Sequence, residues 1–140
     1  MRGAAVALGL SLFAVAPAVA DTIDVLKANT LVLHHADGKV FTLLVKEDAD
    51  MEQVNGAGMW AAGFWGLNGQ DFCWTARGES AACIPLPADK TVGDRWEIRN
   101  PLGKLIWTAE IQEGRADLKA VAAQIKAAKS AAKAGAEGHE

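Results

Sequence analysis

The sequence has little that supports nucleophilic, phosphate or metal chemistry. Beyond residue 20 it holds two serines, Ser80 and Ser130, and neither stands in the strand–turn–helix context of a serine nucleophile. No glycine-rich phosphate loop precedes a helix, because the glycines between residues 56 and 66 stand in strand context and are typical of bends or bulges. His34 and His35 are adjacent on an expected strand, so they point to opposite faces and are poorly placed to share a metal. We therefore predict a non-enzymatic protein with no metal and no cofactor.

An excess of positive charge is also missing. The formal net charge is −3, and it is unevenly distributed. Residues 21–114 carry eight basic and fourteen acidic side chains, whereas residues 115–140 carry five basic and three acidic ones. The acidic body argues against nucleic acid as the main partner.

Only the N-terminus has a long apolar run. Arg2 precedes the apolar stretch from Ala4 to Ala16, and Ala18-Val19-Ala20 has the small-x-small pattern of a cleavage site. This arrangement is typical of a secretory signal peptide and is short for a membrane span. We expect residues 1–20 to be removed after Ala20, which gives a periplasmic or secreted protein with no membrane span.

Residues 30–111 read as a succession of short strands separated by turn signals. Turn signals every 8–12 residues favour a sandwich or a barrel, and closure of a barrel removes exposed sheet edges. We predict an all-β fold: a single eight-stranded antiparallel up-and-down barrel over residues 21–114. The expected strands are Thr30–His35, Val40–Val45, Met51–Asn55, Gly56–Leu67, Asp71–Thr75, Ala81–Leu86, Asp94–Arg99 and Lys104–Ile111.

The two segments that flank the barrel are expected to be helical. Asp21 to Asn29 has room for one short turn of helix before the first strand. Residues 115–140 form a C-terminal region in which Arg115 to Ala134 is rich in Ala and Lys and has a narrow apolar stripe, with Gly135 as the expected stop. This helix either packs on the barrel or projects into solvent, with docking onto a partner as the alternative.

Cys73 and Cys83 are the only cysteines, and exported proteins usually hold such a pair oxidised. Their midpoint is Gly78, at an expected turn, so direct pairing across that hairpin sets them opposite each other. We predict a structural disulfide between Cys73 and Cys83.

The large aromatic residues fall on one face of the expected strands. With Asn68-Gly69 as a two-residue turn, Trp65 faces Phe72 and Gly63 faces Trp74; in the last hairpin, Trp96 faces Trp107 and Ile98 faces Leu105. These residues either fill a narrow barrel or line an aromatic pocket. We name Gly63, Trp65, Phe72, Trp74, Trp96 and Trp107 as candidate ligand-binding residues. We expect at most a shallow apolar pocket at one mouth, where the glycines open room beside Trp74.

Carboxylate chemistry is the remaining route to an enzyme. Asp71, Asp94, Glu97 and Glu110 stand near expected strand ends, where convergence of two of them would support acid–base catalysis. Solvation at strand ends is the simpler interpretation.

Several short stretches carry a family resemblance: Gly63-Phe64-Trp65, Asn68 to Trp74, Cys83 to Leu86, Val92 to Trp96 and Gly114-Arg115. Together they resemble small exported calycin-like (lipocalin-like) β-barrel proteins of alphaproteobacteria. The resemblance covers residues 30–115 and implies a barrel fold and an exported location. The Gly-x-Trp signature of lipocalins near the first strand is absent here.

The leading functional hypothesis is therefore a periplasmic β-barrel that binds a small apolar or aromatic ligand or a protein partner. The alternative is an inhibitor of an envelope-directed hydrolase, a protease or a lysozyme, and a third option is an enzyme built on the carboxylates. An internal cavity favours the ligand, a rigid loop with exposed apolar or acidic side chains favours the inhibitor, and a buried carboxylate pair favours the enzyme.

Overall fold

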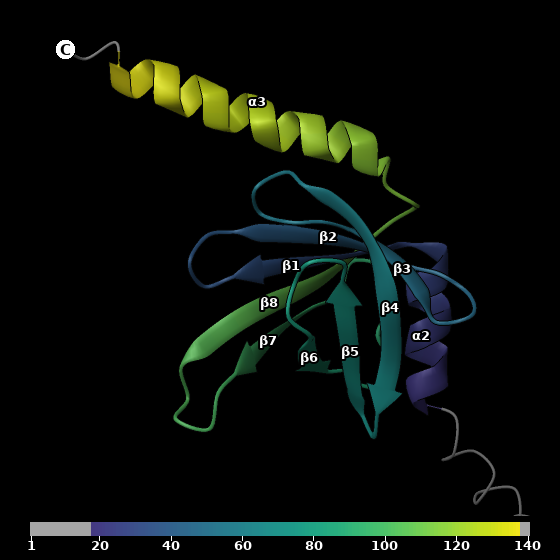
Figure 1. The fold of residues 1–140 in the computed structure, drawn as a ribbon. Coiled ribbons are helices and arrows are strands. Elements are labelled where there is room, and N and C mark those ends of the chain that lie inside the picture. The colour runs from purple at the N-terminus through teal and green to yellow at the C-terminus, as the bar shows by residue number, and fades with distance from the viewer. Residues whose placement is uncertain (1–17, 138–140) are drawn as a thin grey trace, which may run out of the picture.

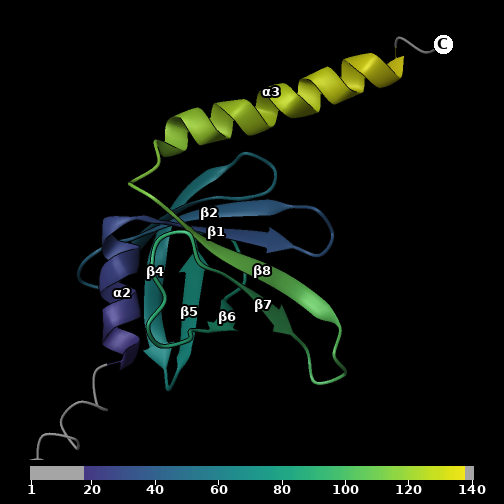
Figure 2. The same ribbon diagram turned by 180° about the vertical axis from the view of Figure 1, so that it is seen from behind.

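The chain folds into a nearly closed barrel of eight antiparallel strands, flanked by two helices (Figures 1 and 2). The computed structural model describes residues 18–137. The helices are α2 (Ala18–Ala28) and α3 (Leu118–Glu137), and the strands are β1 (Thr30–His35), β2 (Val40–Val45), β3 (Asp50–Val54), β4 (Trp60–Asn68), β5 (Asp71–Ala76), β6 (Ala82–Pro85), β7 (Arg95–Arg99) and β8 (Leu105–Gln112). The predicted fold class is confirmed.

The sheet follows the chain order with one closing pair. Its strands run β6-β5-β4-β3-β2-β1-β8-β7, so β1 pairs with both β2 and β8. β6 and β7 stand at the two ends of this order and are joined by residues 86–94. The barrel therefore has a seam between β6 and β7, where the ladder is interrupted.

Alternation of residue type along the strands separates an interior from an outer wall. Leu31 and Leu33 of β1 point inward, as do Leu43 and Val45 of β2, and all four are fully buried. β-branched and aromatic residues are suited to such a half-buried pleated surface. The interior holds most of the apolar core of the protein.

The register expected for the β4–β5 hairpin is wrong by two residues. Trp65 pairs with Trp74 and Leu67 with Phe72, because the two-residue turn is Gly69-Gln70 rather than Asn68-Gly69. Gly69 has φ = 62°, which suits glycine at the first central position of a tight hairpin turn. A shift of two residues preserves the inward face of each strand.

The register expected for the last hairpin is also wrong. Trp96 pairs with Ala109 and Ile98 with Trp107, and an irregularity between Ile98 and Arg99 then brings Arg99 opposite Leu105. A bulge of this kind places one extra residue in one strand, which pairing by turn position alone does not anticipate.

The N-terminal helix is longer than expected. α2 is an 11-residue helix, not one short turn, and it lies along one side of the barrel (Figure 1). Ile23 and Leu26, one helical turn apart, are buried in the barrel core. Of the predicted signal peptide, residues 1–17 lie outside the described residues, and Ala18–Ala20 form the first turn of α2.

The C-terminal helix both packs and projects. Leu118 forms a second apolar cluster with Leu44 and Val54 on the outer wall of β2 and β3, and Val121, Ala122 and Ile125 pack against it. The C-terminal end of α3 extends past the barrel (Figures 1 and 2). It begins after Asp117, whose carboxylate accepts hydrogen bonds from the backbone N–H groups of Lys119 and Ala120, and it continues through Gly135, so the expected stop there is wrong.

Within residues 18–137, neither helix has the length and hydropathy needed to cross a bilayer.

Candidate functional site

The aromatic residues predicted to face the interior do so. Phe72 and Trp74 are buried in the main core cluster, and Trp65, Trp96 and Trp107 pack against it while remaining partly exposed. Trp65 stacks on Phe72 with ring centroids 5.9 Å apart, Phe72 stacks on Trp74 at 5.7 Å, and Trp74 meets Trp107 edge-on at 6.3 Å. These contacts fill the interior with one connected aromatic cluster.

The glycine expected to open room in the interior does not open it. A Cβ atom on Gly63 would lie 2.0 Å from the backbone oxygen of Thr75 and 2.9 Å from the Cα of Ala76. The backbone of β5 therefore occupies the space that a side chain would need, so the expected opening beside Trp74 is wrong. Gly63 allows two strands to approach closely.

The buried end of Trp74 is held by polar groups. Its indole Nε1 donates to Oε1 of Gln53 at 3.0 Å, and Nε2 of Gln53 donates to Glu79 at 3.0 Å. Gln53 is 1% exposed. A buried indole with a satisfied N–H and a buried amide with partners on both sides are stable structural elements.

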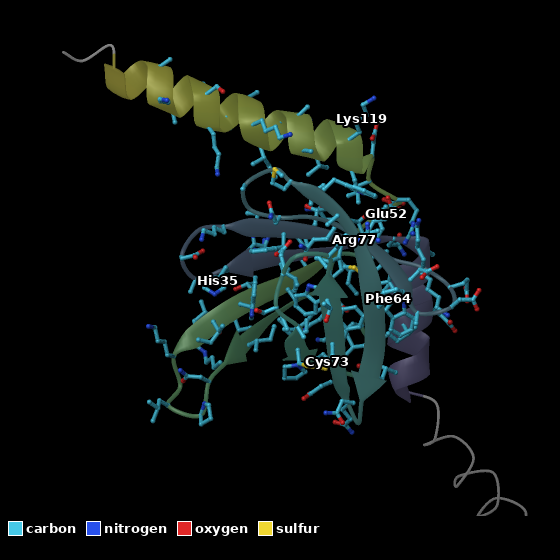
Figure 3. The ribbon with its side chains drawn as sticks, viewed as in Figure 1. His35, Glu52, Phe64, Cys73, Arg77 and Lys119 are labelled. Carbon is cyan, nitrogen blue, oxygen red and sulfur yellow. A yellow bond between two sulfur atoms is a disulfide. The ribbon has the colours of Figure 1, made fainter. Side chains whose placement is uncertain are left out.

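The predicted disulfide is present. Cys73 and Cys83 are directly opposite in the β5–β6 register and are bonded. Both alternate with inward-facing residues, so the bond lies on the outer wall near the seam (Figure 3).

The outer wall of β3, β4 and β5 carries the features that an interaction site requires. Trp60 and Phe64, both on β4, are 53% and 68% exposed, and Met59 beside them is 56% exposed. Large apolar side chains that gather on a surface commonly mark an interaction site. Sequence alternation predicts the inward tryptophans but does not mark Trp60 or Phe64 as site residues, although the alternation that turns Trp65 inward also turns Phe64 outward.

Two grooves meet on this wall at Trp60 and Glu52. One, of about 540 Å³, runs along β3, β4 and β5. Its lining is Lys46, Asp50, Met51, Glu52, Trp60, Ala62, Gly63, Phe64, Thr75 and Arg77. The other, of about 740 Å³, runs between α3 and the wall. Its lining is Leu44, Glu52, Gly58, Trp60, Ala116, Asp117, Leu118, Lys119, Ala122, Ala123 and Lys126. We call this continuous surface the outer groove; Figure 3 labels four of its lining residues, Glu52, Phe64, Arg77 and Lys119.

Glu52 organises the centre of the outer groove. Its carboxylate forms an ion pair with Lys46 and accepts a hydrogen bond of 2.9 Å from Nε1 of Trp60. The hydrogen bond from Lys46 is the main cause that holds the pKa of Glu52 below its ordinary value, and the Trp60 indole adds to it. Glu52 is thereby kept ionised and fixes the edge of the Trp60 ring.

The turn before β3 is rigid and acidic. Asp48 and Ala49 have φ angles of 58° and 64°, which are uncommon for residues with a Cβ. Trp65 clamps this turn, because its backbone N–H donates to Ala49 O and its indole donates to Lys46 O, both at 2.8 Å. Glu47 forms an ion pair with Lys27 of α2 at 3.1 Å.

The other candidate residues from the sequence are held in separate places. His35 is on the inward face of β1, where it packs edge-on against Trp107 and stays partly exposed beside Asp37, whereas His34 lies 3.6 Å from Glu110 on the outer wall, so the expected opposite orientation of the two is confirmed. Glu110 also lies 3.4 Å from Arg95 and accepts a hydrogen bond from Gln112, which is the main cause that lowers the pKa of Glu110.

Two of the other three carboxylates proposed for catalysis, Asp94 and Glu97, are also engaged elsewhere. Glu97 pairs with Arg99, and Asp94 accepts a hydrogen bond from the backbone of Thr91.

Comparisons with protein-family models, with curated proteins and with solved structures found no match. The calycin-like resemblance therefore stays a prediction beyond the barrel shape itself.

Proposed function

We propose that this chain is a non-catalytic binding protein of the cell envelope, and that it takes small apolar ligands in the outer groove. The observation that carries the proposal is the exposure of Trp60 and Phe64 on the wall of this groove, while the aromatic residues of the interior pack against one another. Grooves of 300–1,000 Å³ with apolar walls and a few oriented polar groups are typical small-molecule sites. Each of the two parts of the outer groove, of about 540 and 740 Å³, falls within this range and has both apolar and polar lining residues.

Preorganisation also supports the proposal. Trp60 reaches the groove with its indole N–H already bonded to Glu52, so the ring is oriented before a ligand arrives. An aromatic ring that is held in place loses little entropy on binding and presents a large contact area.

The binding proposal is tested with N-phenyl-1-naphthylamine, an uncharged apolar dye whose fluorescence rises in apolar sites. We expect saturable binding that is weakened in Trp60→Ala and in Phe64→Ala. Leu102→Ala is the matched control, because Leu102 is 93% exposed but lies in the β7–β8 turn, away from the groove. Absence of saturable binding, or equal loss in the Leu102 variant, contradicts the proposal.

The envelope location rests on the N-terminal pattern of residues 1–20. Cleavage after Ala20 leaves the part of α2 that contacts the barrel, since Thr22 donates to Pro87 O and accepts from the backbone of Lys90. N-terminal sequencing of protein recovered from the periplasm should begin at Asp21. A cytoplasmic protein that retains Met1 would contradict this part of the proposal.

Inhibition of an envelope-directed hydrolase is the second candidate, and the acidic turn favours it. Glu47 and Asp48 lie in a turn whose conformation is restrained by two hydrogen bonds from Trp65. A restrained loop loses little conformational entropy when it enters an enzyme cleft. Assay of lysozyme and periplasmic protease activity, with and without the protein, tests this candidate. Inhibition that is lost in Asp48→Ala supports it, and unchanged hydrolysis rates at saturating protein exclude it.

A further inference from the structure

We propose that the outer groove selects single-chain amphiphiles with a carboxylate head, such as fatty acids. The head lies against Lys119 and Lys126 of α3, and the chain runs over Trp60 toward Phe64. This inference rests on the proposed function, because it names the class of ligand that the same groove takes.

The charges around the groove favour an anionic head. Both carboxylates of the α3 side already have partners: Glu52 is engaged by Lys46 and Trp60, and Asp117 accepts hydrogen bonds at the start of α3. In contrast, no ion pair involves Lys119 or Lys126 within the part of the chain for which side chains are described. Two cations therefore line the α3 side of the groove without an ion-pair partner among the described side chains. A carboxylate accepts charge-assisted hydrogen bonds from such ammonium groups.

The floor between α3 and the wall suits an alkyl chain. It is formed by the apolar side chains of Leu44 and Leu118 and by the small residues Ala122 and Ala123. The helix sits directly on the β3–β4 turn, since a Cβ on Gly58 would lie 3.1 Å from the backbone oxygen of Ala122. This close approach holds α3 at a set distance and leaves the groove open beside it.

The groove continues from the α3 side along the outer face of β4, where the alkyl chain of the ligand would lie. Trp60 belongs to both parts of the groove, and Phe64 follows on the same face of β4. Four residues along a strand span roughly 13 Å, which a chain of about ten carbons can cover. Figure 3 shows Lys119 on α3 above the wall and Phe64 lower on β4, with Glu52 between them.

Competition against N-phenyl-1-naphthylamine tests whether the groove prefers ligands with a carboxylate head group. The competitors are decanoate, decanamide and decyltrimethylammonium, each used below its micelle concentration. We expect decanoate to displace the dye at concentrations about tenfold or more below the other two, the factor that one charge-assisted hydrogen bond supplies. Nonspecific attraction by the acidic body would favour the cation instead. Equal displacement by all three overturns the inference while leaving the proposed function intact.

Lysine variants on α3 test where the carboxylate head of the ligand binds. The double variant Lys119→Gln, Lys126→Gln should reduce decanoate to the potency of decanamide. Lys133→Gln is the matched control, since it removes a lysine from the part of α3 beyond the groove lining and should change nothing. Equal loss in both would show that the charge of the helix as a whole, not the groove, attracts the anion, and would overturn the proposed site.

A variant that blocks the groove tests where the alkyl chain of the ligand lies. Ala123 is exposed and lines the groove, so Ala123→Leu should fold normally and weaken displacement by all three competitors. Dye binding that persists in this variant with unchanged decanoate potency places the ligand elsewhere and overturns the inference. If the dye does not bind the unaltered protein at all, the proposed function fails together with it.

Discussion

The two faces of β4 use similar residues for opposite purposes. Inward, Gly63 and Trp65 join the barrel: the glycine lets β5 approach, and the tryptophan stacks on Phe72 and clamps a neighbouring turn. Outward, Trp60 and Phe64 leave more than half of their surface in solvent. An aromatic residue of β4 therefore either packs into the core or is exposed on the outer wall, according to which side of the strand it occupies. Composition alone does not separate the two roles.

The largest expected effect compares two phenylalanines on opposite faces. Phe72→Ala should cost about 3–5 kcal/mol in the free energy of unfolding, because Phe72 is fully buried and contacts two tryptophans. Phe64→Ala should cost about 0.5 kcal/mol or less, since Phe64 is an exposed surface residue. Denaturant unfolding monitored by circular dichroism measures both. Similar costs for the two would remove the distinction between the faces.

The next comparison uses two glycines of β4. Gly63→Ala should destabilise by about 1–3 kcal/mol, because the new Cβ meets the backbone of Thr75 and the strands must separate. Gly66→Ala is the matched control on the other face, where nothing lies within 4 Å of the added Cβ. We expect it to be neutral or slightly stabilising. Thermal and denaturant unfolding of the two variants measure this difference. A Gly63→Ala variant as stable as the unaltered protein would contradict the close approach of β4 and β5 at Gly63.

Much of the interior could be predicted from sequence, because alternation and turn signals constrain it. The inward set from Trp65 to Trp107 followed from a period of two, and this set survived register errors of two residues at both hairpins. The Cys73–Cys83 pairing followed from the position of Gly78. The role of Gly63 did not follow, since close approach of backbones depends on strand coiling that a sequence pattern does not record.

The outer groove was harder to predict because it depends on an element far along the chain. Alternation places Trp60 and Phe64 outward, but the larger part of the groove beside Trp60 forms only because α3 docks across the β3–β4 turn. That docking depends on Leu118 meeting Leu44 and Val54. Helical periodicity gave the apolar stripe of α3 without indicating the wall on which it packs.

Arg115 links α2 and β2 to the segment before α3 and provides a smaller test. Its Nη1 donates to the backbone oxygens of Leu26, Asn29 and Val45, so it ties the end of α2 and the end of β2 to the segment that leads to α3. Arg115→Lys should cost about 1–2 kcal/mol, because a lysine keeps the charge but does not reproduce the reach of the guanidinium.

Dye binding should weaken in the same Arg115 variant if the position of α3 depends on this tie. Arg99→Lys is a suitable control, since the hydrogen bonds of the Arg99 side chain within the described residues go to Gly103 and Glu97 of its own hairpin. Equal costs for the two arginines would argue against a special role for Arg115.

The smallest expected effect concerns pH and the centre of the outer groove. The pKa of Glu52 is lowered in the folded protein, mainly by the hydrogen bond from Lys46, so below about pH 4.5 the unfolded chain takes up this proton first. The contribution of Glu52 to stability is therefore present at neutral pH and is lost as the pH falls through the folded value. We expect Glu52→Gln to cost about 0.5–1 kcal/mol at pH 7, a modest value because the pair is partly solvated, and less than that at pH 3. Denaturant unfolding of both proteins at the two pH values measures this difference. A cost that stays constant with pH would show that the Lys46–Glu52 pair does not stabilise the wall, and that the orientation of Trp60 depends on packing alone.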